Sequence, residues 1–176
     1  MSDLMYNEVP VKGDHYSFGD WKLYAKHDAS NVCGFFGPYR WLSNFHECPV
    51  YFEGLEYPSS ENAYQAAKVD KDFRHHLQKI TAAEVKKAWN KLPPIDMGPE
   101  DWNARKYDVM SVILFDKFYR NKDLREKLLE TGLNHMYLEE TNHWRDSYWG
   151  VDINLGGKNK LGQILMGIRE FWKPAE

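Results

Sequence analysis

The feature that constrains the fold most is a change in hydrophobic pattern near Pro58. Before this proline, aromatic and β-branched residues gather in short runs separated by turn residues, which is typical of strands. After it, apolar residues recur three and four positions apart, which is typical of amphipathic helices. The pattern therefore predicts an α+β fold, a helix-rich single domain with a small β-sheet of short strands formed mainly by the first part of the chain. The strand-like runs are residues 21–25, 32–36, 50–52 and 55–57.

Turn and capping residues set the expected boundaries of these elements. Glu53 and Gly54 predict a tight hairpin, and residues 37–44, which contain Gly, Pro, Ser and Asn, are expected to form a loop. Ser59 or Ser60 is expected to cap a helix, and the segment that starts at Thr81 fits a capping box. Helices are expected over residues 59–69, 73–80, 81–90, 100–120, 124–132 and 159–172, a strand over 133–138, and a loop over 142–157.

The composition favours one domain with a substantial core. The chain has 176 residues, of which 43% are hydrophobic and 15% aromatic, so stability requires neither a disulfide nor a metal. We expect a single domain over residues 21–176 and a loosely attached arm over residues 1–20. The formal net charge of −3 disfavours a protein that contacts many phosphates of duplex DNA. A ligand of nucleotide size remains compatible with this charge.

The cysteines and histidines form no recognisable cofactor site. Cys33 and Cys48 lack CxxC spacing, and the seven histidines show no zinc-binding pattern, so no metal or redox cofactor is expected. The first residues contain no apolar stretch typical of a signal peptide, and the apolar runs are too short to span a bilayer. We expect a reduced, cytoplasmic protein with no membrane partner.

One helix face carries a group of polar side chains. Glu61, Tyr64, Gln65 and Lys68 are spaced i, i+3, i+4 and i+7, so they share a face of the helix expected over residues 59–69. This face is either an ordinary solvated surface with a weak ion pair or a pocket wall on which a carboxylate, a phenol, an amide and an ammonium converge. The spacing alone fits both interpretations.

A lysine lies inside an apolar stripe of the longest expected helix. Trp102, Lys106, Val109 and Ile113 share one face, and an unpaired buried ammonium is costly. Lys106 therefore either extends its charged end to solvent or meets an anion. In the second case Trp102 and Lys106 together present a stacking surface and a cation to one ligand.

A glycine-rich segment precedes the last expected helix. Gly157, Lys158 and Asn159 stand at the start of this helix, where free backbone N–H groups favour an anion. The segment is not a Walker A loop, because Asn159 replaces the Ser or Thr that follows the lysine in that motif. A tight turn without a ligand explains the glycines equally well.

Four motifs resemble a known family when they are taken together and in order. They are WLSNF at residues 41–45, YPSSENAYQAAK at 57–68, Trp102 with Lys106 and Met110, and DSYWG with GGKNKLGQILMGIRE between 146 and 170. The chain is similar in these motifs to the YbiA-like N-glycosidases of the NADAR superfamily. The resemblance covers about residues 35–171.

The resemblance implies hydrolysis of an N-glycosidic bond. Members of the family cleave the base–ribose linkage of riboflavin-pathway intermediates or remove ADP-ribose from modified guanine. Glu61 matches the essential glutamate of the family, and Trp102 and Trp149 match its two tryptophans. The family pattern has an aspartate directly after the WG pair, where this chain has Val151. The second carboxylate is therefore either Asp152, which we favour, or Asp146.

The mechanism implied by the resemblance needs one carboxylate near the anomeric carbon. Glu61 would stabilise an oxocarbenium-like state or deprotonate the attacking water. The residues expected to bind substrate are Trp102, Trp149, Asn44, Lys68, Lys106, Gly157, Lys158 and Asn159. The expected partner is a small ribosylated or ADP-ribosylated molecule, or such a modified base within a nucleic acid. The alternatives are a non-catalytic module that binds ADP-ribose or nucleotides, and a structural protein whose tryptophans fill the core.

Overall fold

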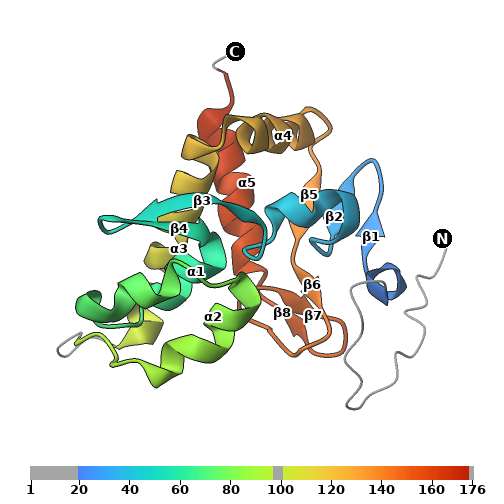
Figure 1. Cartoon of the computed structure of the whole chain (residues 1–176). Coiled ribbons are helices and arrows are strands. Elements are labelled where there is room, and N and C mark those ends of the chain that lie inside the picture. The colour runs from blue at the N-terminus through green and yellow to red at the C-terminus, as the bar shows by residue number, and fades with distance from the viewer. Residues whose placement is uncertain (1–19, 97–100, 175–176) are drawn as a thin grey trace.

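The computed structural model describes residues 20–96 and 101–174 (Figure 1). The arm expected over residues 1–20 lies, apart from Asp20, outside the described residues. The described elements are helices and short strands, so the expected α+β class is confirmed. None of the described helices combines the length and the apolar content that crossing a membrane requires.

The N-terminal elements differ from the expected ones. The strand predicted at residues 21–25 is wrong, because the chain forms a 3-10 helix, η1 (Asp20–Leu23), and strand β1 begins only at Lys26 (Lys26–His27). Asp28 explains this position, since its Oδ1 accepts hydrogen bonds from the N–H groups of Ser30 and Asn31 at 2.8 Å each. This turn pairs β1 with β2 (Asn31–Cys33). The loop expected over residues 37–44 contains a 3-10 helix, η2 (Gly37–Leu42).

The hairpin expected around Glu53 and Gly54 is confirmed. It joins β3 (Glu47–Phe52) to β4 (Leu55–Ser59), and both turn residues have positive φ, 43° and 90°, as tight hairpin turns require. Helix α1 (Ser60–Ala66) follows β4 directly, and Ser59 Oγ accepts a hydrogen bond from the N–H of Asn62, as expected for the cap. The helix ends earlier than residue 69, because Val69 pairs with Pro94 in an isolated bridge.

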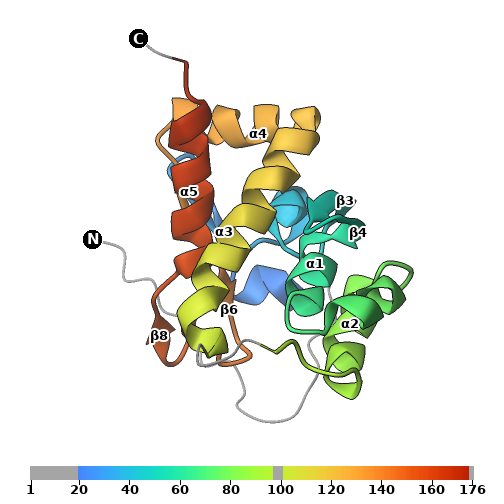
Figure 2. The same ribbon diagram turned by 90° about the vertical axis from the view of Figure 1, so that its left-hand side faces the viewer.

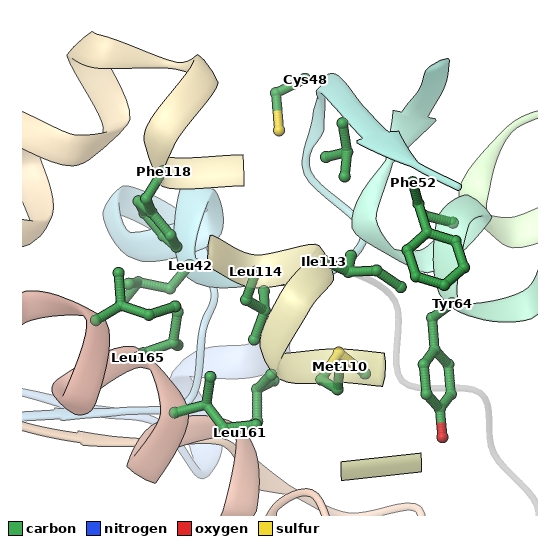
Figure 3. Close-up of a cluster of buried hydrophobic side chains, with 14 of the residues drawn as sticks. Leu42, Cys48, Phe52, Tyr64, Met110, Ile113, Leu114, Phe118, Leu161 and Leu165 are labelled. Atoms are coloured by element: carbon green, nitrogen blue, oxygen red, sulfur yellow. The ribbon is translucent and has the colours of Figure 1, made fainter. Parts of the chain in front are cut away.

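The remaining helices agree with the expected ones to within a few residues. They are η3 (Lys71–Leu77), α2 (Ala82–Ala88), η4 (Trp89–Lys91), α3 (Trp102–Arg120), α4 (Lys122–Leu133) and α5 (Lys160–Trp172). The capping box at Thr81 is present. Helix α3 is central, because it contacts β3, α1 and α5 (Figure 2). Its buried face meets residues of η2, β3 and α5 in one hydrophobic cluster (Figure 3).

Within residues 20–96 and 101–174 the strands form three small sheets rather than one, and half of these strands lie in the C-terminal part of the chain. Strand β5 (Tyr137–Glu139) pairs in parallel with β2, so the first sheet joins distant parts of the sequence. The expected loop over residues 142–157 contains most of another sheet, formed by β6 (Thr141–Asn142), β7 (Val151–Asp152) and β8 (Gly156–Gly157). Strands of two residues are too short to show an alternating pattern, so the sequence did not indicate them.

Candidate active site

One cavity of about 620 Å³ brings together segments that are far apart in the sequence. Its lining comes from η2 and the residues after it, from α1, α2 and α3, and from the region between β5 and α5. The charged residues that line it are Arg40, Glu61, Lys68, Lys86, Glu140 and Asp146, and the aromatic ones are Phe36, Phe45, Tyr64, Trp144 and Trp149. Acids, cations and aromatic rings therefore share one space.

A second groove of about 720 Å³ lies between the β3–β4 hairpin and the outer face of α3. Tyr51, Val112 and Tyr119 are among its lining residues. Of the described residues predicted to bind or act on substrate, none lines this groove. We therefore place the candidate site in the cavity that contains Glu61.

The polar face of α1 forms one wall of this cavity. Glu61, Tyr64, Gln65 and Lys68 all line it, so the pocket-wall interpretation holds over that of a solvated surface. Glu61 is only 6% exposed. Gln65 Nε2 donates a hydrogen bond to Glu61 Oε1 at 2.8 Å, and Lys68 Nζ donates one to Gln65 Oε1 at 2.8 Å. The amide of Gln65 thus connects the carboxylate to the ammonium.

Burial dominates the electrostatics of this wall. It raises the pKa of Glu61, while the hydrogen bond from Gln65 and the charges of Lys86 and Lys68 act in the opposite direction. Burial also lowers the pKa of Lys68 to about 8, and the charge of Glu61 partly offsets this effect. The ammonium of Lys68 lies 4.7 Å from the ring centroid of Tyr64 and 4.5 Å from that of Trp89. Burial thus shifts the pKa of each group toward its neutral form, and strongly perturbed pKa values of this kind are typical of functional sites.

The rings of the two predicted tryptophans both lie near the ring of Tyr64. The ring centroid of Tyr64 is 5.3 Å from that of Trp102 and 5.6 Å from that of Trp149. Trp149 lines the cavity, whereas Trp102 does not and instead packs against Tyr64 and lies 5.5 Å from Lys68 Nζ. Trp102 therefore positions residues of the α1 wall, and Trp149 is available to contact a ligand.

The two candidate aspartates have different surroundings. Asp152 is 2% exposed, and its Oδ2 accepts the N–H of Arg145 at 2.8 Å while its Oδ1 accepts those of Asn154 and Leu155 at 2.9 and 3.0 Å. Both of its oxygens hold the turns around β7, and it does not line the cavity. Asp146 does line the cavity. Of the two predicted aspartates the structure therefore brings Asp146, and not the favoured Asp152, to the cavity lining, and which of them acts on substrate stays a prediction.

The predicted anion site at the start of α5 is also corrected. The backbone N–H groups of residues 158–161 donate hydrogen bonds to the carbonyl oxygens of residues 147, 150, 148 and 149, respectively, at 2.9–3.2 Å. These donors hold the loop that carries Trp149 and are not directed at a ligand. Gly157 belongs to β8. The side chain of Asn159 does not cap the helix, since its Nδ2 donates to the carbonyl of Leu138 at 2.9 Å.

Lys106 and Lys158 contact an aromatic ring outside the cavity lining. Their Nζ atoms lie 3.8 Å and 5.8 Å, respectively, from the ring centroid of Tyr148. Lys106 Nζ also donates a hydrogen bond to Asn103 Oδ1 at 2.9 Å. Neither lysine lines the cavity. The structure therefore does not bring these two predicted substrate-binding residues to Glu61.

Asn44 fixes one edge of the cavity. Its carbonyl oxygen accepts the N–H of Glu61 at 3.0 Å, and its Nδ2 donates to Met110 Sδ at 3.4 Å. Its Oδ1 is buried and has no hydrogen-bond partner among residues 20–96 and 101–174. This oxygen can accept a hydrogen bond from a ligand in the cavity.

Sequence reasoning missed Arg40, Lys86 and Glu140. Arg40 Cζ and Lys86 Nζ lie 5.8 Å and 5.6 Å from the ring centroid of Phe45, so η2 and α2 each bring a cation to the same aromatic ring at the cavity. Arg40 directly precedes the WLSNF motif, which was a usable signal. Glu140 lies in a segment without periodicity and offered none. In the described part of the chain, no three His, Cys, Asp or Glu side chains group as metal ligands would, and the need for a cofactor stays untested.

The chain that forms this cavity has a clear family relationship. The model of the family described as NADAR domain matches residues 27–172. The chain belongs to the NADAR domain family. The match includes every cavity residue named above, so the candidate site lies within the NADAR domain.

Related proteins agree with this assignment. The chain is 35% identical over 130 residues to a riboflavin biosynthesis protein of Vibrio vulnificus, a match that covers 73% of this chain and 34% of that protein, so the chain spans about a third of its length. It is 33% identical over 132 residues to N-glycosidase YbiA of Shigella boydii, covering 73% and 79%. The NMR structure of the E. coli protein YbiA superposes with a TM-score of 0.67 at 28% identity, covering 84% of this chain and 87% of that one.

Proposed function

We propose that this NADAR protein is an N-glycosidase that hydrolyses the bond between a nucleobase-like heterocycle and a phosphorylated ribose or ADP-ribose. The observation that carries the proposal is the buried carboxylate of Glu61 in a cavity that also contains aromatic rings and cations. The similarity to proteins named N-glycosidase supports the same reaction class.

Glu61 is the group that acts at the sugar. Breaking a C–N bond at an anomeric carbon develops positive charge on the ribose, and a carboxylate beside that carbon stabilises this charge or accepts a proton from the attacking water. Removal from solvent strengthens such an interaction. The hydrogen bond from Gln65 orients the carboxylate, and Lys68 holds the amide of Gln65.

The other residues of the cavity fit the remaining parts of the substrate. Trp149 and Tyr64 offer aromatic surfaces for the heterocycle. Arg40 and Lys86 are the cations that we assign to phosphate, in place of the residues at the start of α5. Asn44 and Asp146 also line the cavity, and we assign them to orient a ribose hydroxyl or the attacking water.

Two substrate classes fit this arrangement, a phosphoribosyl intermediate of the riboflavin pathway and an ADP-ribosylated guanine, free or in a nucleic acid. The similarity to a riboflavin biosynthesis protein supports the first class. Both classes present a heterocycle, a ribose and phosphate, so the same side chains serve either.

The test is a chromatographic screen of both substrate classes for released free base. Glu61→Gln should lower the rate by about 10²–10⁴-fold, because an amide can neither accept the proton nor carry the charge. Glu56→Gln is the matched control, since Glu56 is exposed on β4 and should retain the wild-type rate.

Two outcomes would contradict the proposal. A folded Glu61→Gln protein with wild-type turnover would remove Glu61 from the mechanism. If the protein binds the ribosylated compounds but releases no base even after long incubation, it is a binding module instead.

A further inference from the structure

Glu140 contributes another buried carboxyl to the cavity of Glu61. Glu140 is the single residue between β5 and β6, and both its N–H and its carbonyl oxygen form hydrogen bonds. Its N–H donates to Asn159 Oδ1 at 3.1 Å, and its carbonyl oxygen accepts the N–H of Val151 at 2.9 Å. The backbone from which this side chain extends is therefore held by the residue that precedes α5 and by β7.

The glycine of the WG pair makes room for Glu140. A Cβ at Gly150 would overlap the carbonyl oxygen of Glu140 and lie 3.2 Å from its Cγ. Any larger residue at this position would displace Glu140. The requirement for glycine next to Trp149 is thus connected to the placement of a carboxyl in the cavity.

One oxygen of the Glu140 carboxyl has no hydrogen-bond partner among the described residues to stabilise a negative charge. This oxygen, Oε2, is buried. The charged groups that act on it come from the surrounding elements and are Arg40 of η2, Asp146 of the loop before β7, Lys117 of α3 and Lys86 of α2. Burial outweighs the cations and raises the pKa of Glu140 to about 8. Glu61 differs, because Gln65 donates an N–H to it.

We propose that Glu140 is the general acid of this site and protonates the heterocycle as it departs, while Glu61 acts as the carboxylate. The inference rests on the N-glycosidase function proposed above. The bond between the anomeric carbon and the heterocycle nitrogen breaks, and its electron pair remains on the heterocycle, which takes the proton of Glu140. The water oxygen bonds to the anomeric carbon and gives a proton to Glu61. Transfer of that proton through solvent restores Glu140, so the net change is the addition of one water.

The first test compares leaving groups with different needs for a proton. A ribose 5-phosphate carrying a neutral aminopyrimidine requires protonation at nitrogen, whereas the pyridinium of nicotinamide mononucleotide departs as a neutral molecule. Glu140→Gln should lower kcat by about 10²–10⁴-fold for the first compound and change it only a few-fold for the second. Glu61→Gln should lower both rates. Glu139→Gln, one residue away and outside the cavity lining, should lower neither.

The pH profile adds a second readout. The wild-type rate on the aminopyrimidine compound should fall as the pH rises through about 8, where Glu140 loses its proton. This decline should be absent with the pyridinium. Equal loss of both activities in Glu140→Gln would mean that Glu140 only positions other groups, and unchanged activity on the aminopyrimidine compound would remove it from the reaction.

Infrared spectroscopy tests the protonation of Glu140 without turnover. The difference spectrum between wild type and Glu140→Gln should show the carbonyl band of a protonated carboxylic acid below pH 8 and lose it above. An ionised Glu140 at pH 7 would overturn the inference whatever the protein hydrolyses. If the acid is protonated but no riboside is cleaved, both the proposed function and the inferred role fail, and the chemistry of the site is different.

Discussion

Lys117 is a lysine that is buried in the core of the molecule. It is 0% exposed, and its Nζ donates a hydrogen bond to the carbonyl oxygen of Ser43 at 2.9 Å. The sequence prediction placed Lys106 in the apolar stripe of α3, but the buried face runs through Val109, Met110, Ile113, Leu114, Lys117 and Phe118. A stripe drawn from Met110 instead of Trp102 would have identified Lys117. The predicted stripe thus included Val109 and Ile113 of the buried face but ended one turn before Lys117.

The burial of Lys117 predicts a pH dependence of stability. Burial lowers its pKa from 10.5 to about 8 in the folded protein, so between these values the unfolded chain binds more protons than the folded one. The free energy of unfolding should therefore rise as the pH increases across this interval. Lys117→Met should remove this contribution. Thermal denaturation at a series of pH values measures it as a flatter dependence of Tm on pH.

Lys122→Met is the control for this measurement, because the side chain of Lys122 is 77% exposed. Its curve should follow that of the wild type. Parallel curves for wild type and Lys117→Met would contradict the assigned cause.

At the scale of elements, α5 contains two glycines with opposite surroundings. A Cβ at Gly162 would overlap the carbonyl oxygen of Leu138 and lie 2.5 Å from Asn159 Oδ1, whereas a Cβ at Gly167 would meet nothing within 4 Å. Gly162→Ala should therefore destabilise the protein by about 1–3 kcal/mol through overpacking. Gly167→Ala should stabilise it by about 0.5–1 kcal/mol, because alanine restricts the unfolded chain and favours the helix.

Each variant serves as the control for the other, since both change glycine to alanine in one helix. Differential scanning calorimetry should show Tm shifts of opposite sign, at about 2–4 °C per kcal/mol for a protein of this size. Shifts of the same sign would mean that the close approach of α5 to β5 is not the deciding factor.

Elements with strong local signals were predictable, and those set by distant partners were not. The hairpin at Gly54, the caps at Ser59 and Thr81 and the long helix α3 follow from residues that are neighbours in the sequence. The two-residue strands β6, β7 and β8 exist only because they pair with one another. Glu61 was found through helical spacing and the motif, but Glu140 reaches the cavity through contacts with Gly150 and Asn159 that no local pattern encodes.

At the scale of the whole molecule, the cavity joins the N-terminal and C-terminal parts of the chain. Arg40 comes from η2, Lys86 from α2, and Asp146 from the loop before β7. A ligand that contacts all three stabilises the folded state by mass action, by about 2.7 kcal/mol at a concentration of 100 times Kd. Ligand binding is therefore measurable as thermal stabilisation.

The proposed phosphate contacts predict which variants a phosphorylated ligand stabilises less than the wild type. Ribose 5-phosphate should raise the Tm of the wild type, and the double variant Arg40→Met/Lys86→Met should weaken its binding by about 10-fold or more, since each charge-assisted hydrogen bond contributes roughly 1.5–3 kcal/mol. Ribose without phosphate should bind both proteins equally. Lys158→Met should behave as wild type, because Lys158 does not line the cavity. A loss of ribose 5-phosphate binding in Lys158→Met alone would instead indicate a phosphate site at the start of α5.

Residues 147–150 are attached to the start of α5, so the cavity wall that they form is more rigid than the opposite wall. The N–H groups of residues 158–161, at and just before the start of the helix, donate to this loop, so the backbone at Trp149 can move away only if several hydrogen bonds break together. Entry of substrate and exit of products are therefore expected on the side of Phe45 and Ala83, where the lining reaches the exposed surface of α2. The selection of the heterocycle should then depend on the rigid wall that carries Trp149. The rate of exchange with solvent should depend on the opposite, more flexible wall.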